Sequence, residues 1–294
     1  MLNVVLIGSN ILLYTLQNLL FTMYANRYPG KAKYTSFVYS VLCGIILAFV
    51  SLVFGGFNLE FNALTLLFGV LNAIVFPCYY LTIDLAAKNG PYSIVMLFAV
   101  AGGITVPVFV SYIAFGDTPS VWKLLCFVAI FIAGYFVTKK PGEEGIKNKK
   151  KFFLAAFALA LANGAYGGLI NLQKGFTGET QNDEMLIYTF VGASIASAII
   201  LFAKNKKETP KLFVQTKGSL LFLLFASLSS AFAINMLVII SGFIDVNLLW
   251  TYNNSGVLVL SVISSAIFFK EKITLGNTLG CAVIAVMLVL INFC

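Results

Sequence analysis

Amide and tyrosine side chains recur inside the long apolar runs of this chain. Near the N-terminus, Asn3, Asn10, Gln17 and Tyr24 follow one another at intervals of seven residues, with Tyr14 beside them. This spacing places them on one face of a helix. Polar side chains inside a lipid-facing run face either a neighbouring helix or a wet cavity. We favour a cavity lining. Hydrogen bonding between helices, at about 0.6 kcal/mol per bond, is the alternative.

A second polar group lies near the middle of the apolar run 244–269. Here Trp250, Tyr252, Asn253 and Asn254 stand almost side by side. Adjacent amides offer donors and acceptors to a neutral polar ligand, and the rings can stack on it. With similar residues from other runs, the predicted substrate-binding residues are Asn10, Tyr14, Gln17, Asn72, Tyr80, Asn163, Tyr166, Lys174, Asn235, Trp250, Tyr252, Asn253 and Asn254.

Two charged residues near the ends of apolar runs each have two interpretations. A cation at Lys174 can meet an anionic group of a substrate, or it can be a solvated lysine near Glu179. Asp84 lies within an apolar run with Lys88 four residues later. An ion pair at the membrane edge is the favoured interpretation of that spacing. Titration of Asp84, coupled to proton transport, is the alternative.

Several kinds of chemistry have no residues to carry them. The chain contains no histidine and five cysteines. None of the cysteines has a C-x-x-C or His/Cys metal spacing, so we predict no metal site and no cofactor. Paired embedded carboxylates and a nucleophile–base pair are also missing, which disfavours an enzyme.

The composition indicates a membrane protein. Of 294 residues, 60% are hydrophobic and 10% charged, whereas a soluble domain carries about 25% charged residues. The net charge of +8 lies in short loops and forms no basic face, so we expect a lipid bilayer as partner and no nucleic acid. The first apolar run lacks a basic segment before it and a cleavage site after it, which favours a membrane span over a signal peptide.

Ten apolar runs are long enough to cross a bilayer as helices, which need about 20 residues. We predict spans at Asn3–Ala25, Tyr34–Phe54, Asn62–Leu85, Pro91–Phe115, Val121–Thr138, Phe152–Gln173, Met185–Ala203, Gly218–Gly242, Ile244–Phe269 and Ile273–Phe293. The predicted fold class is therefore an all-α polytopic membrane protein with ten transmembrane helices.

Loop charges predict the orientation, because cytoplasmic loops are enriched in Lys and Arg. Of the 19 basic residues, only Lys123 and Lys174 lie on one side, which leaves 19 − 2 = 17 on the other. The loops after the odd-numbered spans, including the basic loop Lys139–Lys151, are predicted to be cytoplasmic. Both termini are then outside, and the expected location is the plasma membrane.

The basic loop divides the chain into two halves of five spans. Five is odd, so the second half enters the membrane in the opposite sense, as in the inverted repeats of many secondary transporters. A shift of 154 residues overlays Pro91–Thr138 on Asp245–Asn292, which pairs Gly102 with Gly256 and Asp117 with Glu271. The predicted units are residues 1–138 and 152–294, with 139–151 as a linker.

The segment from Phe268 to Gly280, FFKEKITLGNTLG, followed by an apolar helix, resembles the segment that closes each half of EamA-type proteins in the drug/metabolite transporter superfamily. The segment Phe115–Pro119 resembles a weaker first copy. The resemblance implies a carrier of two inverted five-helix units. In such carriers spans 1, 3, 4, 6, 8 and 9 line the path and spans 5 and 10 are peripheral. Familiar members are often described with both termini in the cytoplasm, whereas the charges here indicate the reverse.

The expected function is secondary transport, by alternating access, of a small polar neutral or zwitterionic metabolite such as an amino acid, sugar or nucleoside. A flippase for a lipid-linked substrate, or an accessory membrane subunit, is the alternative. A groove open to lipid would favour the flippase, and a closed central cavity the carrier. We expect a monomer or a weak homodimer.

Overall fold

The computed structural model describes residues 2–116, 118, 120–138, 146–178, 181–205, 209–244, 246–271 and 275–290, and all regular structure in these ranges is helical. The helices are α1 (Leu2–Arg27), α2 (Thr35–Phe54), α3 (Ala63–Asn89), α4 (Tyr92–Phe115), α5 (Val121–Thr138), α6 (Lys149–Thr177), α7 (Asn182–Asn205), α8 (Thr209–Leu212), α9 (Lys217–Ser241), α10 (Val246–Phe268) and α11 (Leu275–Leu290), with a short 3₁₀ helix η1 (Ala32–Tyr34) before α2.

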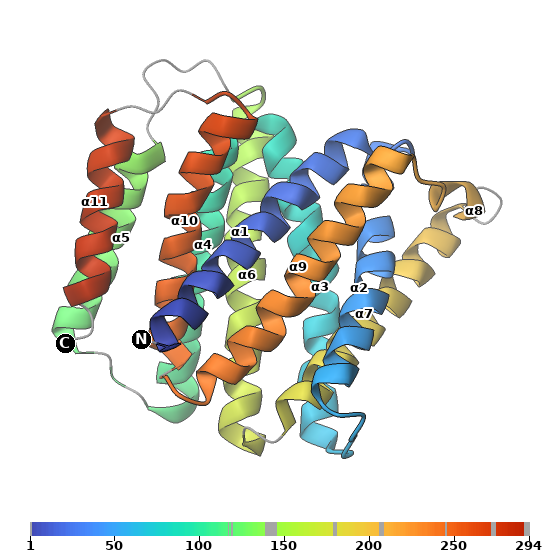
Figure 1. Ribbon diagram of the computed structural model, residues 1–294, viewed down its shortest axis with the longest axis horizontal. Helices are drawn as coiled ribbons and strands as arrows, with labels where there is room; N and C mark the ends of the chain where they lie inside the picture. The colour runs from blue at the N-terminus through green and yellow to red at the C-terminus, as the bar shows by residue number, and fades with distance from the viewer. Residues whose placement is uncertain are drawn as a thin grey trace.

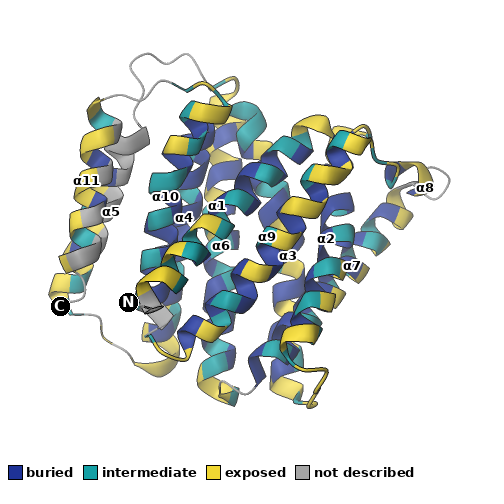
Figure 2. Cartoon of the chain, viewed as in Figure 1, coloured by how far each residue is buried: buried dark blue, intermediate teal, exposed yellow. Residues whose placement is uncertain are grey.

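Long apolar helices make this a polytopic membrane protein. Among the described residues, seven helical stretches are long and apolar enough to cross a bilayer: α1, η1 with α2, α3, α4, α6, α7 and α9. Large apolar side chains such as Phe49, Phe109 and Phe225 are exposed on the outside of the bundle, and buried residues face inward (Figure 2). This inside-out distribution suits a bundle whose surroundings are lipid.

Side-chain caps fix where several helices begin. Asn62 Oδ1 accepts hydrogen bonds from the backbone N–H groups of Leu64 at 2.9 Å and Thr65 at 3.2 Å, at the start of α3. Asn148 caps α6 in the same way. Such a cap stabilises a helix by about 1 kcal/mol. Because α6 already begins at Lys149, the last three residues of the predicted linker are helical. Residues 139–145 of that linker lie outside the described ranges.

The helices pack in pairs across the bundle (Figure 1). Helix α1 lies against α9 and α3 against α6, while α2 lies against α7 and α4 against both α6 and α10. Helices α5 and α11 lie side by side at one edge (Figure 1). The central space is therefore bounded by α1, α3, α4, α6, α9 and α10.

The crossing of α4 and α6 depends on two glycines. A Cβ atom at Gly102 would lie 1.8 Å from the carbonyl oxygen of Ala160, and one at Gly164 would lie 2.4 Å from the carbonyl oxygen of Gly102. The two backbones are thus in direct contact, which small residues permit in membrane helix pairs. The glycines bring the polar residues of α4 and α6 to the same depth.

Aromatic rings fill the space between α1, α2 and α3. The ring centroids of Phe21 and Tyr39 are 4.7 Å apart, those of Phe21 and Tyr80 4.7 Å, and those of Tyr39 and Tyr80 4.6 Å. All three side chains are fully buried. Tilted and edge-to-face pairs of this kind contribute about 0.5–1.5 kcal/mol each beyond burial. They hold Tyr80 in one position.

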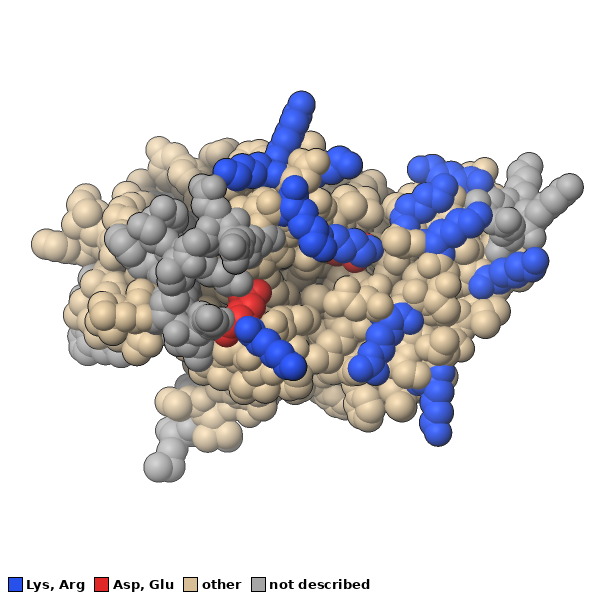
Figure 3. Space-filling view, turned by 90° about the horizontal axis from the view of Figure 1, so that it is seen from above, with Lys and Arg blue, Asp and Glu red and all other residues tan. Residues whose placement is uncertain are grey.

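Basic residues mark one end of the bundle. Arg27 and Lys88 stand in the last turns of α1 and α3, and Lys204 in the last turn of α7, while Lys149 and Lys217 begin α6 and α9. Figure 3 shows that Lys and Arg side chains gather on this face, which we call the basic face, around a hollow with acidic side chains. The opposite end carries Asp183 and Glu184 in the first turn of α7.

The short helix α8 is tied to the basic face by Tyr28. Its hydroxyl donates a hydrogen bond to the carbonyl of Leu212 at 2.7 Å. Burial raises the pKa of Tyr28 to about 12, so the hydroxyl keeps its proton at neutral pH and remains a donor.

Candidate functional site

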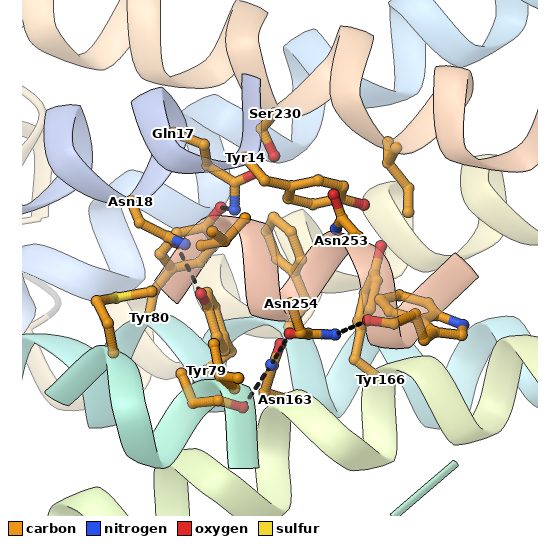
Figure 4. Close-up of a pocket in the computed structure, with 17 residues that line it drawn as sticks. Tyr14, Gln17, Asn18, Tyr79, Tyr80, Asn163, Tyr166, Ser230, Asn253 and Asn254 are labelled. Carbon is orange, nitrogen blue, oxygen red and sulfur yellow. Dashed lines mark hydrogen bonds between the residues drawn. The ribbon is translucent and has the colours of Figure 1, made fainter. Parts of the chain in front are cut away.

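A polar cavity lies in the middle of the bundle, between α1, α3, α4, α6, α9 and α10 (Figure 4). Water-sized molecules can place their centres in about 50 Å³ of it, which is room for about four waters at roughly 10–15 Å³ each. The described lining residues are Tyr14, Gln17, Asn18, Phe76, Tyr79, Tyr80, Met96, Ala99, Val100, Asn163, Tyr166, Ser230, Ile234, Trp250, Asn253, Asn254 and Val257. None of these side chains is charged.

One wall joins α1 to α3 by two hydrogen bonds. Gln17 Nε2 donates to the hydroxyl oxygen of Tyr80 at 3.1 Å, and the hydroxyl of Tyr79 donates to Asn18 Oδ1 at 2.7 Å. Figure 4 shows these two pairs next to each other. Both bonds are buried, so they fix the amide planes and leave the faces of the rings for the cavity.

The opposite wall is a chain of amides that links α4, α6 and α10. Asn163 Nδ2 donates to the Ala99 carbonyl at 2.8 Å and to Asn254 Oδ1 at 3.3 Å, and Asn254 Nδ2 donates to the Trp250 carbonyl at 2.8 Å. Gly103 makes room for this chain, because a Cβ there would lie 2.5 Å from both Asn163 Nδ2 and Asn254 Oδ1. The three helices are thus held in register beside the cavity.

Four polar atoms of the lining have no hydrogen-bond partner among the described residues. They are the hydroxyl of Tyr14, Oε1 of Gln17, Nε1 of Trp250 and Oδ1 of Asn253, and each is buried. A buried polar group without a partner costs about 1–3 kcal/mol. These four atoms belong to residues that line the cavity, but each exposes less than 1 Å² to a water-sized probe, so a bound molecule would satisfy them after a small shift of the side chains.

The sequence predictions divide into residues that line this cavity and residues that do not. Those in the lining are Tyr14, Gln17, Tyr80, Asn163, Tyr166, Trp250, Asn253 and Asn254. They come from α1, α3, α6 and α10, which the polar patterns of the runs had indicated. Their proposed role in substrate binding stays a prediction.

Asn10 and Asn235 lie between helices instead. Asn10 Nδ2 donates to the backbone carbonyl of Ala233 at 2.6 Å, across the contact of α1 with α9. Asn235 Nδ2 donates to Ser51 Oγ at 3.1 Å and to the Ala231 carbonyl at 2.8 Å. Both amides serve helix–helix hydrogen bonding, the alternative given above for polar residues in spans.

Asn72, Lys174 and Tyr252 also lie outside the described lining. Asn72 Nδ2 donates to the Tyr166 carbonyl at 3.3 Å, and Lys174 Nζ donates to the Ser241 carbonyl at 2.7 Å. Tyr252 is half-buried on α10, on a side that does not border the cavity. Glu179, the expected neighbour of Lys174, is outside the described residues.

Polar residues that were not among the predicted binding residues complete the lining: Asn18, Tyr79 and Ser230. Asn18 and Tyr79 adjoin the predicted residues Gln17 and Tyr80, and Ser230 lies five residues before Asn235 on the same helix, so the presence of polar groups in these spans was a signal. The direction in which each side chain points depends on the rotation of its helix, which no local pattern reports.

A second hollow lies on the basic face, one to two helical turns from the cavity along the same helices. It offers about 140 Å³ to the centres of water-sized molecules. We call it the basic-face hollow. Its lining includes Asn26, Asp84, Lys88, Tyr92 and Glu271. It adjoins the cavity through neighbouring turns of α1, α3 and α4.

Asp84 and Lys88 form the ion pair that the four-residue spacing predicts. Lys88 Nζ lies 2.5 Å from Asp84 Oδ2, and the side chain of Lys88 is 33% exposed whereas that of Asp84 is 4% exposed. Asp84 lines the basic-face hollow rather than the central cavity. The observed pair supports the structural interpretation of this carboxylate over the coupling one.

Glu271 caps α4 from the far side of the basic-face hollow. Its Oε1 accepts a hydrogen bond from the backbone N–H of Tyr92 at 3.1 Å, and its Oε2 accepts one from Ser93 Oγ at 2.8 Å. An anionic side chain at a helix N-terminus satisfies free N–H groups and the helix dipole. The end of α10 is thereby fastened to the start of α4. Asp117, the predicted counterpart of Glu271, is outside the described residues.

Comparison with known proteins shows the fold. No family model and no curated protein matches the chain. Among 28 solved chains that match, one described only as the crystal structure of a protein is similar with a TM-score of 0.64. That likeness covers 97% of this chain and 96% of the other at 14% identity. The fold and the cavity define the class: a polytopic helical membrane protein with a polar cavity inside its bundle.

Proposed function

We propose that this chain is a secondary carrier of the EamA type, in the drug/metabolite transporter superfamily. It moves a small polar metabolite, neutral or zwitterionic, across the plasma membrane by alternating access to one central site. In this proposal α5, α10 and α11 also cross the membrane, which gives ten spans in all.

The observation that carries the proposal is which helices line the central cavity. In the order of the ten predicted spans, α1, α3, α4, α6, α9 and α10 are the first, third, fourth, sixth, eighth and ninth. These are the six spans that line the path in carriers of this type. Helices α5 and α11, the fifth and tenth, pack on each other at the edge of the bundle.

Helix neighbours support two inverted repeats. If the halves are exchanged, the contact of α1 with α9 corresponds to that of α6 with α3, and the contact of α2 with α9 corresponds to that of α7 with α3. Under the 154-residue shift, Gly102 corresponds to Gly256. Gly102 lies against α6, and Gly256 lies against Ile11 of α1. Because α1 and α6 are themselves counterparts, both glycines occupy the same place in their halves.

The charge distribution supports an orientation with the basic face in the cytoplasm. The residues of this face belong to the loops and helix ends that carry 17 of the 19 basic residues, and positive residues are retained on the cytoplasmic side. The basic-face hollow is then the route between the cavity and the cytoplasm.

Transport by reconstituted vesicles tests the proposal. Purified protein is first screened by thermal shift against a library of amino acids, sugars and nucleosides, because a ligand that binds the folded state stabilises it. The stabilising solute is then offered to vesicles that contain the protein. We expect uptake to be lost in Asn253→Leu and Gln17→Leu and retained in the control Tyr252→Phe, which changes the neighbouring side chain outside the lining.

The outcomes separate the alternatives. Normal uptake by Asn253→Leu and Gln17→Leu vesicles would show that the site is elsewhere. Stabilisation by lipids alone, with no response to any soluble metabolite, would favour the flippase.

A further inference from the structure

We infer that the substrate of the central cavity is an uncharged, planar, single-ring heterocycle with N–H donors and carbonyl acceptors along its edge, of the kind that pyrimidine bases represent. The inference rests on the proposed carrier function and narrows its substrate class. It comes from the charge, the free polar atoms, the rings and the size of the cavity.

The uncharged lining favours an uncharged ligand over ions and zwitterions at this site. The described lining contains no acidic or basic side chain. The neighbouring charged groups are engaged elsewhere: Asp84 pairs with Lys88 in the basic-face hollow, and Lys174 donates to the Ser241 carbonyl. An ammonium or carboxylate in the cavity would be buried with no opposite charge beside it. Lys174 therefore gives no partner to the carboxylate of an amino acid here.

The unpaired polar atoms of the lining residues favour a ligand that both donates and accepts. Gln17 Oε1 and Asn253 Oδ1 are acceptors, while Trp250 Nε1 is a donor and the Tyr14 hydroxyl is either. These groups come from only two helices, α1 and α10. Asn and Gln amides pair well with heterocycle edges on which donor and acceptor alternate, as they do with bases. A hydrocarbon or a quaternary ammonium would leave all four atoms unsatisfied.

The rings favour a flat ligand. Six aromatic side chains stand in the lining: Tyr14, Phe76, Tyr79, Tyr80, Tyr166 and Trp250. The hydroxyls of Tyr79 and Tyr80 already bond to Asn18 and Gln17, so these two residues contribute ring surface. Aromatic faces stack on planar heterocycles with little regard to their substituents. The small free space, about 50 Å³ for water centres, matches one ring better than a nucleoside.

Trp250 provides a direct reporter for this inference. The chain has two tryptophans, and the other, Trp122, is 67% exposed on α5 and does not line the cavity. Trp122→Phe therefore leaves Trp250 as the single indole. Uracil is titrated into this variant while Trp250 emission is followed, and thermal unfolding is measured at the same concentrations as a second readout of binding.

Two derivatives of uracil test its planarity and its N–H donors separately, in the same protein variant. 5,6-Dihydrouracil keeps the donors and acceptors but loses planarity, and 1,3-dimethyluracil keeps the flat ring but loses both N–H donors. We expect saturable quenching and stabilisation by uracil, with at least tenfold weaker binding of either derivative. Leucine, choline and glucose are expected to give no response at the same concentrations.

Each other result overturns the inference. Equal affinity for uracil and the two derivatives would show that neither the planarity of the ring nor its polar edge contributes to binding. Tighter binding of leucine, choline or glucose than of uracil would also refute it, yet would leave a carrier of another substrate. If no soluble metabolite binds in either readout, the proposed carrier function fails together with the inference.

Discussion

The contact of α4 with α6 predicts a large effect for the smallest possible substitution. A Cβ at Gly102 would lie 1.8 Å from the carbonyl oxygen of Ala160 and 2.3 Å from its carbonyl carbon. Real Cβ contacts essentially never fall below 3.0 Å. Gly102→Ala therefore requires the two backbones to separate by at least 3.0 − 1.8 = 1.2 Å, because neither of these atoms is the end of a flexible side chain.

The size of the effect follows from what such a separation breaks. Overpacking alone costs about 1–3 kcal/mol. A shift of 1.2 Å would also stretch the bond from Asn163 Nδ2 to the Ala99 carbonyl from 2.8 Å to about 4 Å, and a lost hydrogen bond costs about 1 kcal/mol. We expect the free energy of unfolding to fall by about 2–4 kcal/mol. Ligand binding should weaken too, since Asn163 borders the cavity.

Chemical denaturation of the purified protein in micelles measures the change in the free energy of unfolding, and two other glycines provide matched controls. Gly8 has no atom within 4 Å of an added Cβ, so Gly8→Ala should gain about 0.5–1 kcal/mol from the better helix propensity of alanine. At Gly256 an added Cβ would lie 2.6 Å from Cδ1, 2.9 Å from Cγ2 and 3.0 Å from Cγ1 of Ile11. These are side-chain atoms that can shift without separating two backbones, so Gly256→Ala should cost about 1 kcal/mol. Equal stability of Gly102→Ala and wild type would refute the close backbone contact.

Three further predictions concern the basic face. Glu271→Gln removes the charge that caps α4, so it should lower the free energy of unfolding by about 1 kcal/mol. It should also speed hydrogen exchange at the backbone amide of Tyr92, and an unchanged exchange rate would contradict the cap. Lys88→Met leaves the carboxylate of Asp84 unpaired and should lower the free energy of unfolding by about 2 kcal/mol, less than for a fully buried pair because Lys88 is 33% exposed. The double variant that adds Asp84→Asn should recover at least half of that loss. A cysteine placed at Glu144, in the loop that charge assigns to the cytoplasm, should resist an impermeant thiol reagent added outside cells, and rapid labelling would reverse the proposed orientation.

Helix positions were predictable because membrane helices are defined by local properties. Helix α4 begins at Tyr92 and ends at Phe115, against the predicted span Pro91–Phe115, since a bilayer span requires about 20 apolar residues regardless of its neighbours. The predicted and observed helices differ at their ends. α6 starts at Lys149 rather than Phe152 because Asn148 caps it, and a lysine-rich turn can be helical once its N–H groups are satisfied. The short α8 has too few residues for a periodic signal.

The site was less predictable, since it depends on how helices cross. Asn10 and Gln17 share one face of α1, but α9 covers that face at Asn10, whereas at Gln17 the face borders the cavity. Tyr252 and Asn253 are adjacent, and the rotation of α10 decides that only Asn253 is in the lining. Hydropathy and spacing identify the polar face of a helix, and the crossing angle decides which of its turns meet a neighbour.

In the proposed carrier, alternating access would assign different tasks to the two glycine contacts that the proposed repeat relates. At Gly102 the backbones of α4 and α6 touch, whereas at Gly256 the side chain of Ile11 fills the space between α10 and α1. A pair of helices joined by backbone contact and by the Asn163 amide moves as a unit, because any separation breaks both. A contact made by a flexible side chain can widen or tighten at lower cost. In the proposed carrier the α1–α10 contact is therefore the one that adjusts first when the halves rock, and the free atoms of Gln17 and Asn253 lie on these two helices. A ligand that joins those atoms would draw α1 and α10 together, which couples binding to the motion.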